Sequence, residues 1–153
     1  MHDLPLLGAS NHVFIGGHWR DGATRETLPL LNPSEGSLLA RIARGNAADI
    51  DAAVQAAQAA LAGDWGRLTA AERGRALMRL SQRVLAAADE LAQLEALDVG
   101  KPLKQARADA LALARYLEFY GGAADKVMGE TIPYVNGTTA LTLREPHGVT
   151  GHI

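Results

Sequence analysis

The chain has 153 residues, of which 48% are hydrophobic and 21% are charged, and its formal net charge is −2. These values are typical of a globular domain with a hydrophobic core, and the mildly negative charge excludes a basic surface for nucleic acid or anionic membranes. Cysteine is absent, which excludes disulfides, thiolate metal sites and a cysteine nucleophile within these residues.

The N-terminal residues 1–12 lack the basic start and the long apolar core of a signal peptide. No apolar run in the sequence approaches the length of a membrane-spanning helix. We therefore expect residues 1–12 to form a flexible arm. We also expect a cytoplasmic protein that has neither a membrane nor a nucleic acid as a partner.

Short antiparallel strands are expected next along the chain. Val13 to Trp19 alternates around a Gly-Gly turn signal. Leu28 to Ile42 predicts two strands joined by the turn Asn32 to Gly36, because proline and glycine supply the backbone angles that such a turn needs. The expected buried residues of the first hairpin are Phe14, Ile15 and Trp19.

Two helices are predicted after these strands. Asn46 is a good N-cap residue, Asp49 suits the positive end of a helix, and Gly63 ends this first helix. Thr69 and Glu72 form a capping box that opens the second helix, which continues until a Gly-Lys-Pro break. The apolar heptad rows of the second helix are Leu77, Val84, Leu91 and Asp98, and Leu80, Ala87 and Leu94.

A third helix and then a hairpin are predicted in the rest of the chain. After Gly129 the pattern changes to a period of two, and Asn136-Gly137 between two such runs is a strong hairpin signal. A two-stranded hairpin is marginally stable alone, so we expect this one to pair with a partner, leaving apolar surface exposed. The expected buried face of the third helix is Leu103, Ala106, Ala110, Leu113, Leu117 and Tyr120. The residues expected to stay uncovered by their own chain are Leu141, Leu143 and Ile153.

Asp98 is the one acidic residue in the apolar rows of the second helix. A carboxylate in such a place must be paired, solvated or bound to a cation. One interpretation is that Asp98 pairs locally with Lys101 or with a backbone amide. The other is that Asp98 binds a monovalent cation, for which hard oxygen ligands are suitable.

The sequence offers no catalytic constellation. It contains no GxGxxG after a strand, no GxxxxGK[ST], no GxSxG and no histidine pair at metal-ligand spacing. Lys101 could act as a nucleophile only with a lowered pKa, and nothing near it in the sequence indicates one. We therefore assign no catalytic residue within these positions.

Six segments, occurring in a fixed order over about 140 residues, make the sequence similar to the N-terminal part of the aldehyde dehydrogenase superfamily. No single segment decides the resemblance, and the series as a whole carries it. The segments are FIGGHWRDG (14–22), LNPSEGSLLARI (31–42), ADIDAAVQAAQAAL (48–61), WGRLTAAERGRAL (65–77), LEALDVGKP (94–102) and REPHGVTGHI (144–153).

The resemblance implies an α/β fold, the N-terminal part of an aldehyde dehydrogenase-like fold. This part would contain a small antiparallel sheet, three helices, a protruding β-hairpin and the first strand of a Rossmann-like nucleotide-binding sheet. Residues 13–130 would be the N-terminal part of the nucleotide-binding domain, and residues 131–145 the oligomerisation hairpin. Residues 146–153 would be the first strand of the nucleotide-binding sheet, truncated at its end.

The resemblance also implies an oxidoreductase that converts an aldehyde to a carboxylic acid with NAD or NADP through a cysteine thiohemiacetal. The nucleophilic cysteine, the general-base glutamate and the oxyanion-holding asparagine would lie beyond residue 153, so the chain alone is expected to be inactive. Ile153 matches a position where the strand begins to line the nicotinamide cofactor. Asp98, with the backbone carbonyl of Leu31 or Leu30, matches a site for Na⁺ or K⁺ in some members. The hairpin 131–144 resembles the arm that makes homo-oligomers, either dimers or tetramers.

A second hypothesis belongs to a different class of protein. Because no catalytic constellation is present, the chain could be a non-enzymatic helical interaction module that pairs through its hairpin. The reading frame beyond Ile153 discriminates between the two: a following Pro-Trp-Asn and a downstream cysteine favour the enzyme.

Overall fold

The computed structural model describes residues 10–153, so residues 1–9 of the expected arm lie outside the described residues. The described part begins with two antiparallel hairpins. Strand β1 (Val13–Ile15) pairs with β2 (His18–Arg20), and β3 (Thr27–Leu31) pairs with β4 (Leu38–Ala43). All four predicted strands are therefore confirmed, although they form two separate two-stranded sheets.

The expected burial of the first hairpin is wrong for its two aromatic residues. Phe14 and Trp19 are opposite each other in the β1–β2 register, and 58% and 60% of their surfaces are exposed. Their ring centroids lie 5.0 Å apart, so each ring covers part of the other. A two-stranded hairpin has no second layer of its own, and the sequence pattern alone does not say whether another element covers it.

Five helices follow: α1 (Ala47–Ala62), α2 (Asp64–Arg67), α3 (Ala70–Ala86), α4 (Ala88–Val99) and α5 (Leu103–Ala123). Both predicted helix starts are confirmed as capping boxes. Asn46 Oδ1 accepts from Asp49 N at 3.2 Å while Asp49 Oδ2 accepts from Asn46 N at 3.1 Å. Thr69 Oγ1 accepts from Glu72 N at 3.3 Å while Glu72 Oε2 accepts from Thr69 N at 2.8 Å.

The second predicted helix is in fact two helices, and this corrects the expectation of three helices in all. The break is at Ala87, where φ is −101° and ψ is 9°. The Ala87 N–H still donates to Arg83 O, and Leu91 N donates to Ala87 O, so the break leaves these backbone groups paired. Neither glycine nor proline marks this position, and the apolar periodicity continues through it, so the sequence pattern shows no boundary there.

Helices α3, α4 and α5 pack together and contain most of the core. The buried face of α5 differs from the one expected, because Leu103, Leu113 and Tyr120 are exposed. Small residues face the neighbouring helices instead, since a close approach of helix axes excludes large side chains. Of the buried residues of α5, Ala106 and Ala110 are as expected, and Ala114 and Gly121 were not expected.

Asp49 joins α1 to the strands that precede it. Its carboxylate is 5% exposed and accepts a hydrogen bond from Ala23 N at 3.0 Å, in addition to the capping bond from Asn46. Gly22 is buried beside it, and a methyl group on Gly22 would lie 3.6 Å from Asp49 Oδ2. The first turn of α1 is therefore fixed to the loop between β2 and β3.

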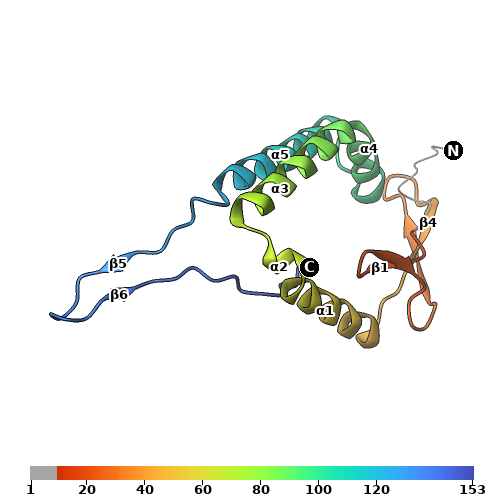
Figure 1. Ribbon diagram of the computed structural model, residues 1–153. Helices are drawn as coiled ribbons and strands as arrows, with labels where there is room; N and C mark the ends of the chain where they lie inside the picture. Colours follow the sequence, from red (N-terminus) through yellow and green to blue (C-terminus); the bar gives the residue numbers. More distant parts are fainter. Residues whose placement is uncertain (1–9) are drawn as a thin grey trace.

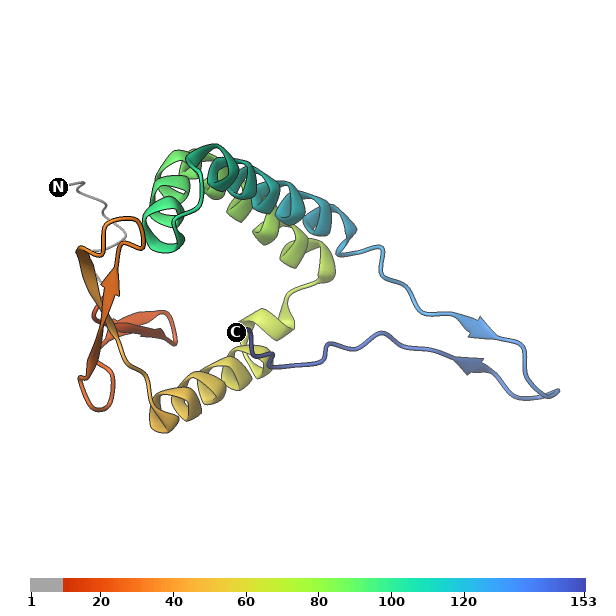
Figure 2. The same ribbon diagram turned by 180° about the vertical axis from the view of Figure 1, so that it is seen from behind.

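The hairpin predicted around Asn136-Gly137 is confirmed in part. Strand β5 (Thr131–Ile132) pairs with β6 (Ala140–Leu141), and Thr138 N donates to Val135 O at 3.1 Å across the Asn136-Gly137 turn. Both views show the hairpin extending away from the helices (Figures 1 and 2). Leu141, Leu143 and Ile153 are all exposed, as expected.

The elements form an open arc rather than a closed core. The α3–α5 bundle lies on one side, α1 lies on the other, and the β1–β4 hairpins connect them (Figures 1 and 2). Helix α1 packs mainly against α2 and β1, and its Ile50 and Leu61 are exposed. Among the described residues no helix is both long and apolar enough to cross a membrane.

Candidate functional site

The C-terminal end of α4 meets the turn between β3 and β4. Gly100 ends the helix with a left-handed backbone, φ 69°, and a methyl group placed on it would lie 3.1 Å from Pro33 Cγ. The turn is held internally, because Asn32 Oδ1 accepts from Ser34 N at 2.9 Å and Asn32 N donates to Ser37 O at 2.8 Å. The fold therefore joins two segments that lie about seventy residues apart in the sequence.

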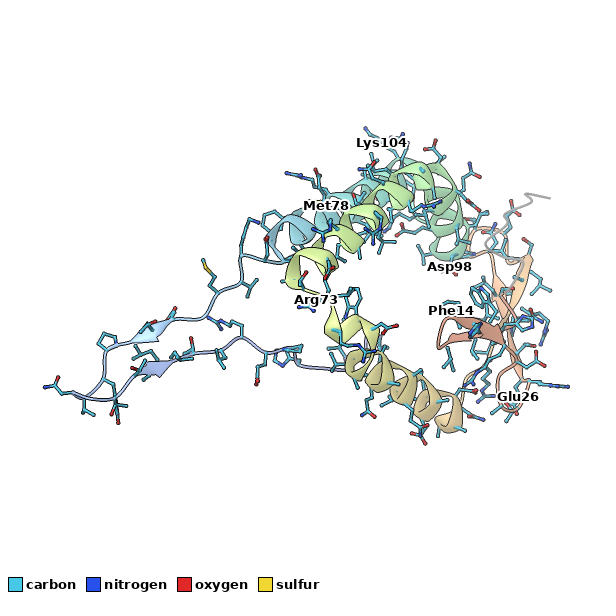
Figure 3. All side chains as sticks on the ribbon, in the orientation of Figure 1. Phe14, Glu26, Arg73, Met78, Asp98 and Lys104 are labelled. Atoms are coloured by element: carbon cyan, nitrogen blue, oxygen red, sulfur yellow. The ribbon has the colours of Figure 1, made fainter. Side chains whose placement is uncertain are left out.

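Two of the three residues expected to bind a cation precede this turn, and the third lies at the end of the helix that packs on it. Leu30 and Leu31 are the last residues of β3, and the register with β4 shifts between them. Such an irregularity interrupts the ladder and frees backbone groups from strand pairing. Asp98 is an exposed residue in the last turn of α4, at the end of the helix nearest the β3–β4 hairpin (Figure 3).

The charges around Asp98 suit a cation. The last turn of α4 contains no basic residue, and the partial negative charge at a helix C-terminus attracts cations. No group of three or more His, Cys, Asp or Glu residues that could hold a metal ion occurs in the described part of the chain. One carboxylate combined with backbone carbonyls fits a monovalent ion better than a transition metal.

Lys101 does not pair with Asp98, so the Lys101 pairing, one of the interpretations of Asp98 left open above, is wrong. The Lys101 ammonium instead donates to Asp109 Oδ2 of α5 at 2.6 Å and to Glu95 Oε1 of α4. The hydrogen bond to Asp109, which has the larger effect, and the one to Glu95 raise the pKa of Lys101 above its ordinary value. A nucleophilic lysine needs the opposite shift, so these ion pairs do not activate Lys101 as a nucleophile.

Sequence reasoning missed Glu95 and Asp109 as partners of Lys101. The two carboxylates come from different helices, and their meeting depends on how α4 packs against α5. With Asp98 they line one pocket of about 370 Å³ that also exposes the apolar side chains of Leu91, Leu94 and Leu113. No spacing in the sequence signals this arrangement.

Ile153 lies apart from the Asp98 region. The C-terminal segment runs past α1 and α2, where a methyl group on Gly148 would lie 3.9 Å from Leu61 Cδ2 (Figure 1). Ile153 is fully exposed, and residues 142–153 form no strand within the described part of the chain. The structure therefore does not bring Ile153 and Asp98 into one site.

A second pocket, of about 460 Å³, lies where this segment passes the helices. Trp65 of α2 and Arg73 of α3 line it together with Arg144, Glu145 and Pro146. One guanidinium nitrogen of Arg73 donates to the backbone carbonyl of Leu68. Trp65 thus takes part in the junction between α1 and α3.

The sequence profile of the family described as "Aldehyde dehydrogenase family" matches residues 19–153. The chain belongs to the aldehyde dehydrogenase family. The series of six segments is thereby confirmed as a family resemblance, and the α/β fold with it. The part of the aldehyde dehydrogenase fold matched by this chain is the N-terminal part.

Named aldehyde dehydrogenases resemble the chain over nearly its whole length. It is 41% identical over 146 residues to the mitochondrial aldehyde dehydrogenase of Rattus norvegicus, which is 94% of this chain and 28% of that protein. It is 41% identical over 141 residues to the hydroxyisobutyraldehyde dehydrogenase of Mycolicibacterium austroafricanum, which is 92% of this chain and 28% of that protein. The chain thus spans under a third of the length of these relatives.

Solved structures show the same likeness. The crystal structure of a protein from Burkholderia cenocepacia, assigned as an aldehyde dehydrogenase, has a TM-score of 0.86 and 63% identity, over 88% of this chain and 28% of that one. The NAD⁺ complex of aldehyde dehydrogenase from Bacillus cereus has a TM-score of 0.88 and 33% identity, over 95% of this chain and 31% of that one.

Proposed function

We propose that the protein containing these residues is an NAD(P)-dependent aldehyde dehydrogenase, which oxidises an aldehyde to a carboxylic acid. The family match over residues 19–153 carries the proposal. NAD⁺ is favoured as the hydride acceptor, because three of the similar solved structures are complexes with NAD. In this reaction a cysteine thiolate forms a thiohemiacetal with the aldehyde, hydride passes to the nicotinamide, and water releases the acid.

These 153 residues supply scaffold rather than reacting groups. They contain no cysteine, so they provide no thiolate for the thiohemiacetal. Residues 146–153 are exposed and belong to no strand of the described chain, so their backbone groups are available to a strand at the start of a nucleotide-binding sheet. In that position the backbone at Ile153 would lie along the nicotinamide cofactor.

The alternative of a non-enzymatic interaction module has less support. The relatives reported above are named dehydrogenases, and none of the observations on the helices favours a partner other than the rest of such an enzyme. A cytoplasmic location stays a prediction of the sequence, and the rat relative is named mitochondrial.

The test of the activity uses the protein at the full length that its gene encodes. Incubation with NAD⁺ or NADP⁺ and a panel of aliphatic and aromatic aldehydes should give aldehyde-dependent formation of the reduced cofactor. The isolated residues 1–153 should give none. The proposal would be contradicted by a full-length protein that binds NAD⁺ but does not reduce it with any aldehyde of the panel. Turnover by the isolated 153 residues would contradict it as well.

We further propose that the β5–β6 hairpin makes the protein a homo-oligomer by adding a strand to a second copy. Thr142 N donates to Glu130 O at 2.8 Å, so the backbone N–H of Thr142 points toward the opposite arm of the hairpin. Because inward and outward pairs alternate in an antiparallel ladder, the N–H groups of Leu141 and Leu143 point away from β5. These free donors suit β-augmentation by a neighbouring strand.

The outer edge of β5 is a poorer docking edge than that of β6. Residue 133 has the same parity as Thr131, so its backbone nitrogen faces outward, and it is a proline without an N–H. Proline on an exposed strand is a common means of preventing strand addition. We therefore assign the partner strand to the β6 side of the hairpin.

Substitution of Leu141 separates backbone from side-chain effects. Leu141→Pro removes the outward N–H and should shift the protein toward a smaller oligomer in analytical ultracentrifugation. Leu141→Thr keeps the N–H and the β propensity, and it should retain the oligomeric state of the unchanged protein. Equal behaviour of the two variants would show that the β6 edge does not carry the contact.

We also propose that Asp98, with the carbonyl of Leu31 or Leu30, binds Na⁺ or K⁺. The register shift between Leu30 and Leu31 and the absence of a basic residue in the last turn of α4 support this site. Because a bound ion stabilises the folded state, NaCl or KCl should raise the melting temperature more than choline chloride at equal ionic strength. Asp98→Asn should abolish that difference, and retention of the difference would exclude Asp98 as a ligand.

A further inference from the structure

The ammonium group of Lys101 is fixed by two carboxylates beside Asp98. Lys101 is three residues after Asp98, and its Nζ donates to Asp109 Oδ2 at 2.6 Å and to Glu95 Oε1. The lysine is half-buried, with 30% of its side chain exposed. One partner belongs to α4 and the other to α5, and the ion pairs therefore tie the two helices together at this end.

Asp98 faces the same pocket as the two partners of Lys101. Glu95, Asp98 and Asp109 all line it, and together with Lys101 they have a net charge of −2. Within residues 10–153, the ion pairs formed by the chain leave the Asp98 carboxylate without a cationic side chain. The pocket thus contains one carboxylate in excess of those that Lys101 contacts, and this one is next to the carbonyl end of α4.

A lysine so close to Asp98 would normally compete with a metal ion. The lysine stem is flexible and its ammonium is a compact cation with three donors, so it can reach a carboxylate three or four positions away. If the ammonium contacted Asp98, it would neutralise the charge that attracts Na⁺ or K⁺. The two ion pairs with Glu95 and Asp109 prevent this contact in the structure.

We propose that Glu95 and Asp109 are positioning residues that hold the Lys101 ammonium away from Asp98 and so keep Asp98 available for a monovalent cation. This inference rests on the cation site proposed above. It assigns the two carboxylates a role in selecting which cation occupies Asp98, a bound ion or the side chain of Lys101.

The test measures the melting temperature of the full-length protein in NaCl, KCl or choline chloride at equal ionic strength. In the double variant Glu95→Gln, Asp109→Asn, the freed ammonium should occupy Asp98. The Na⁺ or K⁺ concentration at half-maximal stabilisation should then rise about tenfold or more. Adding Lys101→Met to this double variant should restore the response, because the competing cation is gone. Lys101→Met alone should keep the response of the unchanged protein.

The outcomes separate this inference from the cation site itself. A double variant that responds like the unchanged protein would overturn the positioning role while leaving the cation site intact. A triple variant that fails to recover would overturn it too, because the loss would then come from the carboxylates and not from Lys101. If the unchanged protein and its Asp98→Asn variant respond alike, the proposed cation site is wrong, and the positioning role is then wrong as well.

Discussion

Gly74 of α3 and Gly121 of α5 face each other, backbone against backbone, where the two helices cross. A methyl group on Gly74 would lie 2.4 Å from Gly121 O, and one on Gly121 would lie 2.9 Å from Gly74 O. Met78, which is labelled on α3 in Figure 3, lies against the same place, 3.0 Å from the methyl position of Gly121. Both glycines are buried, so the distance between α3 and α5 depends on having no side chain at either position.

Gly74→Ala should therefore separate α3 from α5 and destabilise the protein by about 1–3 kcal/mol, the usual penalty of overpacking. Gly122→Ala is the matched control. Its methyl group would lie 3.7 Å from the flexible Met78 Cε, and alanine is a better helix former than glycine by about 1 kcal/mol. Urea unfolding should show a loss for the first variant and no loss for the second. Equal losses would show that the close approach of the two backbones at Gly74 does not cause its loss of stability.

Ser81 provides a polar link across the same pair of helices. Its hydroxyl donates to the backbone carbonyl of Ala114 at 2.8 Å, and the residue is 2% exposed. Ser81→Ala should reduce the free energy of unfolding by about 1 kcal/mol through the lost hydrogen bond. Ser37→Ala, at an exposed serine of the β3–β4 turn, should change it by less than about 0.5 kcal/mol. A larger effect at Ser37 than at Ser81 would contradict this assignment.

Gly100 combines backbone strain with a contact. Its φ of 69° disfavours any side chain by about 1–2 kcal/mol, and a methyl group would also press on Pro33 Cγ at 3.1 Å. Gly17 has a φ of 84° and nothing within 4 Å of its methyl position, so Gly17→Ala reports the backbone strain alone. Gly100→Ala should destabilise the protein more than Gly17→Ala in denaturant unfolding. If the two variants lose the same stability, the contact between α4 and the β3–β4 turn contributes nothing.

The capping box of α3 predicts a dependence on acid pH. The Glu72 carboxylate accepts hydrogen bonds from the backbone N–H of Thr69, which has the largest effect, and from the Thr69 hydroxyl. Both bonds lower the pKa of Glu72 below its ordinary value of 4.5. Because the folded-state pKa is the lower one, the contribution of Glu72 to stability is complete at a pH above the ordinary value of 4.5. It is lost as the pH falls through the folded-state pKa.

Amide exchange in the first turn of α3 measures this effect. Protection should decline as the pH falls below about 4.5, after correction for the intrinsic exchange rate. Glu72→Gln retains an acceptor oxygen without a titrating charge, so its protection should stay level over the same range. Parallel declines in both proteins would assign the pH dependence to another group.

The helix starts could be predicted because a capping box is a local arrangement. Asn46 with Asp49 and Thr69 with Glu72 each form all their bonds within four residues, so side-chain chemistry at fixed spacing is sufficient to identify them. The break at Ala87 could not be predicted in this way. Helices α3 and α4 both pack against α5, and no local residue type marks the boundary between them.

The candidate cation site, too, could be predicted from the sequence only in part. Asp98 was identifiable as an acid among apolar heptad positions, and the resemblance to aldehyde dehydrogenases added Leu30 and Leu31. Glu95 and Asp109 became visible only in three dimensions, because the two partners of Lys101 lie six and eight residues away on different helices. Asp49 shows the same limit: its cap was predictable, and its bond to Ala23 was not.

Residue chemistry at short spacing was enough to predict the four N-terminal strands, the capped starts of α1 and α3 and the Asn-Gly hairpin, and the ordered series of segments was enough to predict the family. Which faces are covered depends instead on how the helices pack. Leu103, Leu113 and Tyr120 of α5, which the periodicity placed inside, are exposed. Ala114 and Gly121 are buried beside the expected Ala106 and Ala110. The physical reason is that periodicity marks an apolar face without specifying its partner, whereas the distance between helix axes selects the side chains that fit between them.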